Sequence, residues 1–231
     1  MKLIVVTPPT FFVEEDQIIT ALFEEGLDIL HLRKPATPAM YSERLLTLIP
    51  EKYHKRIVTH EHFYLQNEFN LSGIHLNARN PQEPHDYAGN ISCTCHSIEE
   101  LKNKKHFYDY VFLSPIFDCI TKADVASAFT AEELRLAAKE KIIDSKVMAF
   151  GGINPDNILE IKDFGFGVIF FVPVDLELFG SMIVDTISSN TSTTFSSNWG
   201  FSVSSATLAG LSVKSSLKDS TKPSAGRGIT L

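Results

Sequence analysis

Short apolar runs recur along the first three-quarters of the chain, and more polar segments with helix-like spacing separate them. Valine, isoleucine, leucine and aromatic residues dominate the runs, as is typical of strands that are buried in a parallel sheet. Seven of the runs are clear, and an eighth is a candidate. The predicted strands are Leu3–Thr7, Ile29–Arg33, Arg56–His60, Gly73–Leu76, Ile91–Cys95, Tyr110–Pro115, Val147–Gly151 and the candidate Val168–Val172.

Several of the intervening segments begin with residues that favour the first turn of a helix. Ser97–Glu100 and Thr130–Glu133 have the spacing of a capping box, in which a hydroxyl and a carboxylate satisfy backbone amides. Thr37-Pro38 and Asn154-Pro155 place a capping residue before a first-turn proline. Because strands that alternate with helices form parallel sheets, we expect an α/β protein.

The number of repeats favours a closed TIM (β/α)8 barrel over an open doubly wound sheet. A flavodoxin-like or Rossmann sheet is the alternative, but no G-x-G-x-x-G follows the first strand, where Val6-Thr7-Pro8-Pro9 stands. We expect the barrel to occupy residues 1–180 as one domain, with an atypical or incomplete eighth unit.

The composition changes abruptly after about Gly167. From Ser181 to Leu231, about 21 of about 51 residues are Ser or Thr, with few charges and little helical periodicity. Nothing there reads as the amphipathic helix that should close the barrel. We expect residues 181–231 to be an irregular Ser/Thr-rich tail or a non-native ending, for example translation in a shifted frame. Reading the coding DNA in the other frames would separate the two.

Composition and charge narrow the class of partner and the compartment. A net charge of -7 without a basic cluster argues against nucleic acid or an anionic membrane as a partner. The apolar opening Met1–Val6 stops at Pro8-Pro9, well short of a membrane span. Three cysteines without C-x-x-C spacing favour the reducing cytoplasm over zinc binding or disulfides. Cys93 and Cys95 alternate along one strand, so we expect them on one face.

Polar residues at the strand ends are the candidates for chemistry, because the C-terminal strand ends line the active site of a TIM barrel. Alternation places His31 and Arg33 on one face of the second strand, which suits proton transfer and anion binding; a solvated polar face is the alternative. Thr59-His60 and Thr94-Cys95-His96 end two further strands, and histidine is the natural acid and base near neutral pH. His75 lies within a strand, where we expect a hydrogen-bonded structural role.

Two later segments are candidate phosphate sites. Gly151-Gly152 follows the seventh strand, where paired glycines let backbone amides approach an anion near a helix N-terminus. Thr121-Lys122 lies in a loop after the sixth strand, where a lysine can act as a mobile positive charge; a solvated loop lysine is the alternative.

From Met1 to about Gly167, the order and spacing of these segments resemble the thiamine phosphate synthase / thiazole tautomerase (TenI-like) superfamily. The Q-x-R-x-K motif of synthases is similar to His31–Pro35, with Arg33 kept, His31 in place of glutamine and Lys34 one place early. The other matching motifs are S-x-H-[ST] with Thr94–Ser97, G-P-[IV]-[FY] with Ser114–Phe117, T-K with Thr121-Lys122, and G-G-I with Gly151–Ile153.

The departures from this family bear on the reaction. Synthases of the family hold magnesium with an N-D pair after strand three and an Asp after strand four. Here Thr59-His60 and Asn80 stand at those places. Because magnesium prefers anionic oxygen ligands, the loss of both carboxylates points away from pyrophosphate activation. A further departure is Pro173 after the eighth strand, which has no N–H to offer to a phosphate.

The resemblance therefore implies an enzyme of thiamine biosynthesis that acts on a thiazole phosphate. Our first hypothesis is a metal-independent thiazole tautomerase that uses no cofactor. The alternatives are thiamine phosphate synthase, which requires Mg²⁺ and for which Asp118 and Asp124 are nearby ligand candidates, and a non-catalytic barrel that binds a phosphorylated ligand. An unrelated phosphate-binding barrel is compatible with G-G-I. A homo-oligomer is left open.

The same resemblance implies roles for the candidate residues. His96 is the expected acid and base, with His31 as its partner. Arg33 is expected to hold the substrate carboxylate. The remaining expected substrate-binding residues are Lys34, Thr59, His60, Thr94, Thr121, Lys122, Gly151 and Gly152.

Overall fold

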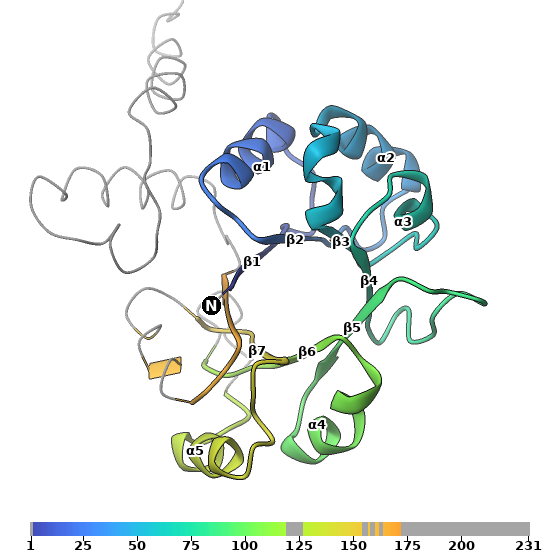
Figure 1. Ribbon diagram of the computed structural model, residues 1–231. Coiled ribbons are helices and arrows are strands. Elements are labelled where there is room, and N and C mark those ends of the chain that lie inside the picture. Colours follow the sequence, from blue (N-terminus) through green and yellow to red (C-terminus); the bar gives the residue numbers. More distant parts are fainter. Residues whose placement is uncertain (1, 119–126, 154–156, 158–159, 162–163, 172–231) are drawn as a thin grey trace, which may run out of the picture. The chain divides into compact units, whose positions relative to one another are not determined.

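Eight parallel strands, paired in chain order, form a closed barrel in the computed structural model of the protein (Figure 1). The structure describes residues 2–118, 127–153, 157, 160–161 and 164–171. Strand β8 closes the barrel because it pairs with both β7 and β1. The prediction of a TIM-type barrel is confirmed. The strands are β1 Lys2–Val6, β2 Ile29–Leu32, β3 Ile57–Thr59, β4 Gly73–Leu76, β5 Asn90–Cys95, β6 Tyr110–Leu113, β7 Val147–Ala149 and β8 Val168–Phe171.

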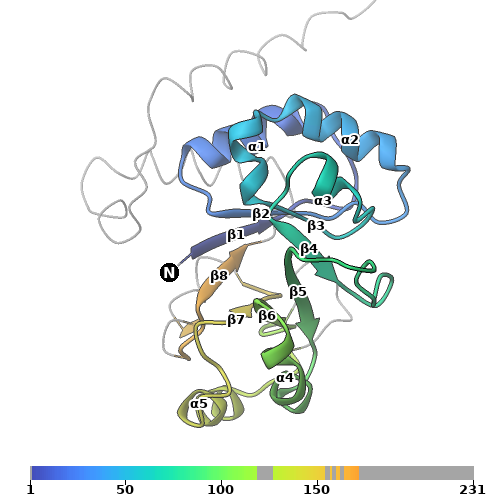
Figure 2. The same cartoon turned by 45° about the vertical axis from the view of Figure 1, so that its right-hand side comes forward.

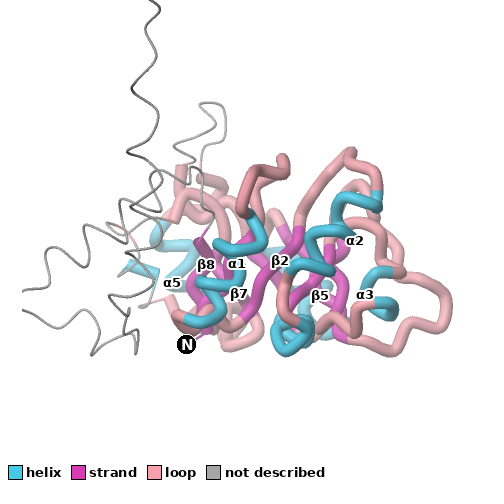
Figure 3. Tube along the Cα trace, turned by 90° about the horizontal axis from the view of Figure 1, so that it is seen from above, coloured by secondary structure: helices cyan, strands magenta, loops and turns pink. Residues whose placement is uncertain are grey.

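Helices lie outside the ring of strands (Figures 1 and 2). The helices α1 and α2 pack on β2 and next to one another (Figure 3). None of the helices in the described part of the chain is long and apolar enough to cross a membrane. The helices are α1 Glu15–Glu24, α2 Ala39–Leu48, α3 Leu65–Glu68, α4 Ile98–Lys104 and α5 Ala131–Lys139, with 3-10 turns at Glu51–Arg56 and Lys105–Phe107.

The fourth unit departs from the expected strand–helix alternation. Residues 77–89, all of which are described, connect β4 to β5 without an α-helix. Asn77 and Asn80 exchange backbone hydrogen bonds of 3.1 and 3.0 Å and so close a turn directly after β4. Proline at positions 81 and 84 removes backbone donors that a helix would use. This part of the barrel rim is therefore a loop.

The two predicted capping boxes begin α4 and α5. Thr130 Oγ1 accepts a hydrogen bond from Glu133 N, and the Glu133 carboxylate accepts one from Thr130 N, which completes the box. Ser97 Oγ accepts from Glu100 N, whereas the Glu100 carboxylate accepts from the N–H of His96. The other two expected caps differ. Thr37 donates to Lys34 O and leaves Pro38 at the N-cap of α2, and Asn154-Pro155 lies outside the described residues.

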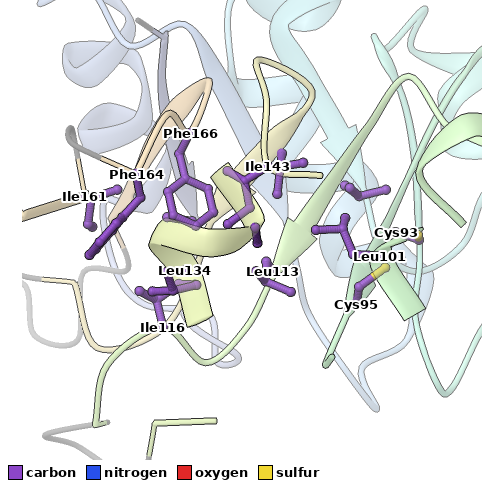
Figure 4. Packing of buried hydrophobic residues seen from close by; sticks show 14 of the residues in the cluster. Cys93, Cys95, Leu101, Leu113, Ile116, Leu134, Ile143, Ile161, Phe164 and Phe166 are labelled. Carbon is purple, nitrogen blue, oxygen red and sulfur yellow. The ribbon is translucent and has the colours of Figure 1, made fainter. Parts of the chain in front are cut away.

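The outward faces of the strands pack against the helices. Cys93 and Cys95 both point outward from β5 and lie buried in one cluster with Leu101 of α4, so the expectation that they share a face is confirmed (Figure 4). Both thiols are free. Leu134 of α5 and Phe164 belong to the same cluster.

The inward faces are divided in character. Ile4, Val6, Phe112 and Met148 form an apolar cluster inside the barrel. Strands β2 to β6 instead contribute polar groups that bond to one another across the interior, and these are His31, His75, Ser92, Thr94 and Tyr110. The polar part of the interior therefore lies beneath the strand ends that carry the candidate residues.

Candidate active site

Arg33 follows β2 directly, and Thr7 at the end of β1 fixes its backbone. Arg33 N donates to Thr7 Oγ1 at 2.9 Å, and that hydroxyl donates to Arg33 O at 3.2 Å. Burial lowers the pKa of the half-buried Arg33 guanidinium from its usual value; the positive charge of Arg79 lowers it further, and Glu61 opposes the change. Because Arg79 repels the charge of Arg33, an anion bound beside Arg33 would stabilise the charged guanidinium.

The segment after β3 is held by the turn after β4. Asn77 and Asn80 both donate from their side-chain amides to His60 O, at 3.3 and 3.0 Å. Glu61 accepts from the backbone N–H of Lys34 at 2.9 Å and from Arg79 Nη2 at 2.8 Å. These bonds join the ends of β2, β3 and β4 into one rigid rim.

Three histidines from these neighbouring strands meet inside the barrel. The rings of His31 and His60 share a hydrogen bond of 2.9 Å between Nδ1 and Nε2, and His31 Nε2 lies 2.7 Å from Tyr110 Oη. The two ring nitrogens of His75 lie 2.8 and 2.9 Å from the hydroxyls of Ser92 and Thr94. The expectation of a hydrogen-bonded His75 is confirmed, and His60 and Thr94 belong to the same network.

The histidine network is held neutral. Burial lowers the pKa of His31 and of His60 well below the usual value, and the neighbouring His75 adds to the effect in both. Burial, with the charge of Arg33, lowers the pKa of His75 to about 3. His31 is fully buried, and among the described contacts none joins it to His96. The structure therefore places His31 below the rim and apart from the expected acid and base.

Lys34 and Thr59 are not positioned as substrate ligands. The Lys34 side chain is 1% exposed and its ammonium lies 2.5 Å from Glu15 Oε1 and 2.9 Å from Thr10 O. This position differs from that expected of a substrate-binding lysine. The shift of Lys34 by one place turns its side chain to the other face of the strand. Thr59 is 1% exposed, and its hydroxyl donates to Glu61 O. Neither side chain is free to contact a substrate at the rim.

His96 lies on the other side of the rim, at the end of β5. It is exposed, and its Nδ1 lies 2.9 Å from Ser114 O. Because a carbonyl oxygen only accepts hydrogen bonds, Nδ1 carries a proton, and Nε2 is left as the nitrogen that can exchange a proton with a substrate. This is the tautomer that a general base requires.

Gly151 and Gly152 lie next to this histidine segment. Their φ angles are 92° and 69°, and a Cβ on Gly152 would collide with the backbone oxygens of Phe117 and Asp118. Phe117 N donates to Gly151 O at 3.1 Å, so the two loops are joined. A residue without a Cβ is therefore required at Gly152 for these two loops to pack, and the anion site at the glycine pair stays a prediction. Thr121, Lys122 and Pro173 lie outside the described residues.

The candidate residues thus form two groups on the rim. One, from β2 to β4, contains Arg33 and His60; the other, from β5 to β7, contains His96 and the glycine pair, and the bond between Thr94 and His75 connects them. Sequence reasoning missed Arg79, Glu61, Ser92 and Tyr110. Alternation along β5 and β6 would have placed Ser92 and Tyr110 inward, whereas nothing local marks the pairing of Arg79 with Glu61.

The family's magnesium site does not fit the donors that are present. At the corresponding places, His60 is an imidazole and Asn80 directs its amide to His60 O. The nearest carboxylate, Glu61, is occupied by Arg79 and by the N–H of Lys34. Asp118 accepts from Ser127 N at 2.6 Å, and Asp124 lies outside the described residues. Magnesium requires several hard oxygen ligands in octahedral array, and the described rim does not supply them.

Comparison with known proteins identifies the family. Residues 3–173 match the family model described as thiamine monophosphate synthase. A thiamine-phosphate synthase of Halalkalibacterium halodurans is 28% identical over 163 residues, which are 65% of this chain and 76% of that protein.

Two solved structures are also similar. A crystal structure of a thiamine phosphate pyrophosphorylase from Bacteroides thetaiotaomicron is 77% identical, with a TM-score of 0.69 over 75% of this chain and 83% of that one. A thiamine phosphate pyrophosphorylase from Pyrococcus furiosus shares the fold at 20% identity, with a TM-score of 0.56 over 74% of this chain and 85% of that one.

Proposed function

Because this chain belongs to the thiamine monophosphate synthase family, we propose that it catalyses the synthase reaction, which joins a pyrimidine pyrophosphate to a thiazole phosphate. In this reaction a carbon–nitrogen bond forms to the thiazole nitrogen while the carbon–oxygen bond to pyrophosphate breaks. Pyrophosphate leaves with the electron pair of that bond. The similarity that carries the proposal is the 77% identity to a protein described as a thiamine phosphate pyrophosphorylase.

The rim offers groups for two anions. Arg33 belongs to the group of candidates from β2 to β4 and would bind the leaving pyrophosphate. Its backbone is bonded to Thr7, and Arg79 repels its charge. Gly151 and Gly152 would bind the thiazole phosphate, because residues without a Cβ permit close approach of backbone amides. Thr121 and Lys122 remain expected ligands from the sequence. Stabilising the departing charge is the main contribution that such a site makes.

Two observations favour a second function, the thiazole tautomerase. The donors at the magnesium positions are His60 and Asn80, and His96 holds the tautomer of a general base. A tautomerase moves a proton and requires no metal, so these features suit it. In that reaction Arg33 would hold the substrate carboxylate and His96 would transfer the proton.

A single experiment separates the candidates. The protein is incubated with the pyrimidine pyrophosphate and thiazole phosphate pair, and separately with the non-aromatic thiazole carboxylate phosphate, each with magnesium and with a chelator. We expect pyrophosphate release from the first pair. Aromatisation that is insensitive to the chelator, without pyrophosphate, would replace the synthase proposal by the tautomerase. If calorimetry shows that the thiazole phosphate binds but neither pyrophosphate nor the aromatic thiazole is formed, the protein is a non-catalytic phosphate-binding barrel.

The compartment and assembly remain predictions. The cysteine pattern favours a cytoplasmic location, which cell fractionation tests, and light scattering tests whether the protein is a homo-oligomer.

A further inference from the structure

The three buried histidines of the barrel interior form a compact set of nitrogen donors. His31 lies on β2, His60 directly follows β3 and His75 lies on β4. One ring nitrogen from each lies within 4.8 Å of the others. Each side chain is at most 5% exposed. Neighbouring parallel strands therefore bring three metal-ligating groups to one level of the barrel.

We propose that His31, His60 and His75 bind one divalent transition metal ion of the zinc and cobalt class. The proposal does not depend on which reaction the rim catalyses. It follows from the convergence of three imidazoles at one place in the barrel interior, since imidazole nitrogen suits zinc, cobalt, nickel and copper better than magnesium.

The cluster needs one unprotonated nitrogen from each ring. His31 and His60 now share a proton between Nδ1 and Nε2, and His31 can carry its proton on Nε2 instead, facing Tyr110 Oη. Positive charge from Arg33 and Arg79 disfavours any divalent cation here. The preference for zinc or cobalt over magnesium therefore comes from the nitrogen donors, because magnesium prefers oxygen ligands.

Hydroxyl groups surround the cluster in the way that orients metal-binding histidines. His31 Nε2 faces Tyr110 Oη at 2.7 Å, which leaves Nδ1 as the inner donor. His75 bonds to the hydroxyls of both Ser92 and Thr94, so one of its nitrogens can turn inward while the other keeps a hydroxyl partner. A hydrogen bond from the ring nitrogen that does not bind the metal fixes the orientation of the ring and its tautomer.

The present hydrogen bond between His31 and His60 marks the position of the ion. Their facing nitrogens are 2.9 Å apart, and two nitrogens at about 2.0–2.1 Å from one ion stand about 2.9–3.4 Å apart. On binding, the His31 proton resides on Nε2 and is donated to Tyr110, so the ring stays neutral. The rings of His60 and His75 are stacked, with an interplanar angle of 22°, so His75 rotates to complete the site.

Cobalt binding to the full-length protein tests the proposal. We expect one Co²⁺ per chain, with ligand-field absorption bands in the visible region that zinc abolishes and magnesium does not. His31→Gln, His60→Gln and His75→Gln should each weaken Co²⁺ binding by about ten-fold or more. His85→Gln is the matched control, because His85 is 94% exposed and outside the cluster, and it should bind like the wild type.

The absence of stoichiometric Co²⁺ binding would overturn the site, and so would binding that all three cluster variants retain. If a variant does not fold by circular dichroism, Cu²⁺ bound to the wild-type protein gives the decisive spectrum. Hyperfine coupling to nitrogen nuclei supports the site, and its absence shows that the histidines are only a hydrogen-bonded core.

Discussion

At the scale of single residues, His96 combines exposure with a defined tautomer. Its Nδ1 proton is donated to Ser114 O, and its Nε2 presents a lone pair at the rim. If proton transfer limits the reaction, as in the tautomerase candidate, His96→Asn should lower kcat by about 10²–10⁴-fold with little change in KM. Steady-state kinetics of thiazole aromatisation measures both constants. Turnover close to that of the wild type would remove His96 from the mechanism.

The buried histidines predict how stability depends on pH. The folded protein keeps His75 neutral until about pH 3, whereas the unfolded chain takes up protons below its ordinary pKa of 6.5. The free energy of unfolding should therefore be unaffected above about pH 6.5 and fall between about pH 6.5 and 3, by up to about 1.4 kcal/mol per pH unit for each such histidine.

Urea unfolding from pH 7 to pH 4 with a chelator present measures this slope. His75→Gln removes one of the groups and should make the slope shallower, while His85→Gln at the surface should leave it unchanged. Equal slopes in the wild type and His75→Gln would show that His75 is already protonated or that its burial is not maintained in solution.

At the scale of elements, a buried ion pair fixes the loop between β1 and α1. Lys34 after β2 pairs with Glu15 at the start of α1, and its ammonium also lies 4.5 Å from the centre of the Phe11 ring. Burial raises the pKa of Glu15 and lowers that of Lys34, and in each case the partner opposes the change. The pair thus joins two elements that flank the rim.

Breaking this pair should destabilise the protein. Lys34→Met leaves the Glu15 carboxylate buried and unpaired, so we expect a loss of about 3–5 kcal/mol in the free energy of unfolding, most of which Glu15→Leu should restore in the double variant. Chemical denaturation of the two single variants and the double variant measures the coupling. A stable Lys34→Met protein with a much raised KM would return Lys34 to the substrate site that the sequence suggested.

At the scale of the whole molecule, Phe112 connects the two halves of the barrel interior. It packs with Ile4, Val6 and Met148, and its ring also contacts the rings of His31 and His75. Phe112→Ala should therefore lower the free energy of unfolding by about 3–5 kcal/mol, and Phe112→Leu should lower it distinctly less. Unfolding followed by both circular dichroism and tyrosine fluorescence tests this. Noncoincident transitions would show that the two halves unfold independently.

Most of the fold could be predicted because its signals are local. Buried parallel strands require continuous apolar runs, and the capping residues at Thr130 and Ser97 act on amides three residues away, so both can be read along the chain. The loop between β4 and β5 was not anticipated, since its backbone bonds between Asn77 and Asn80 take the place of a helix. The residues His60 and Asn80 led the sequence analysis to prefer a tautomerase, whereas the names of the relatives favour a synthase.

The sequence by itself determined the barrel, the inward direction of His31 and Arg33, and the placement of His96 and Gly151 at strand ends, because alternation and strand order are properties of the chain. Only the tertiary structure decided what those side chains touch. Partners such as Lys34 with Glu15, Arg79 with Glu61 and Tyr110 with His31 lie 18 to 79 residues apart. The pairing of Tyr110 with His31 depends on barrel closure, because a closed ring brings strands β2 and β6 across one interior. The other two pairs depend on how neighbouring strand ends and the start of α1 pack at the rim.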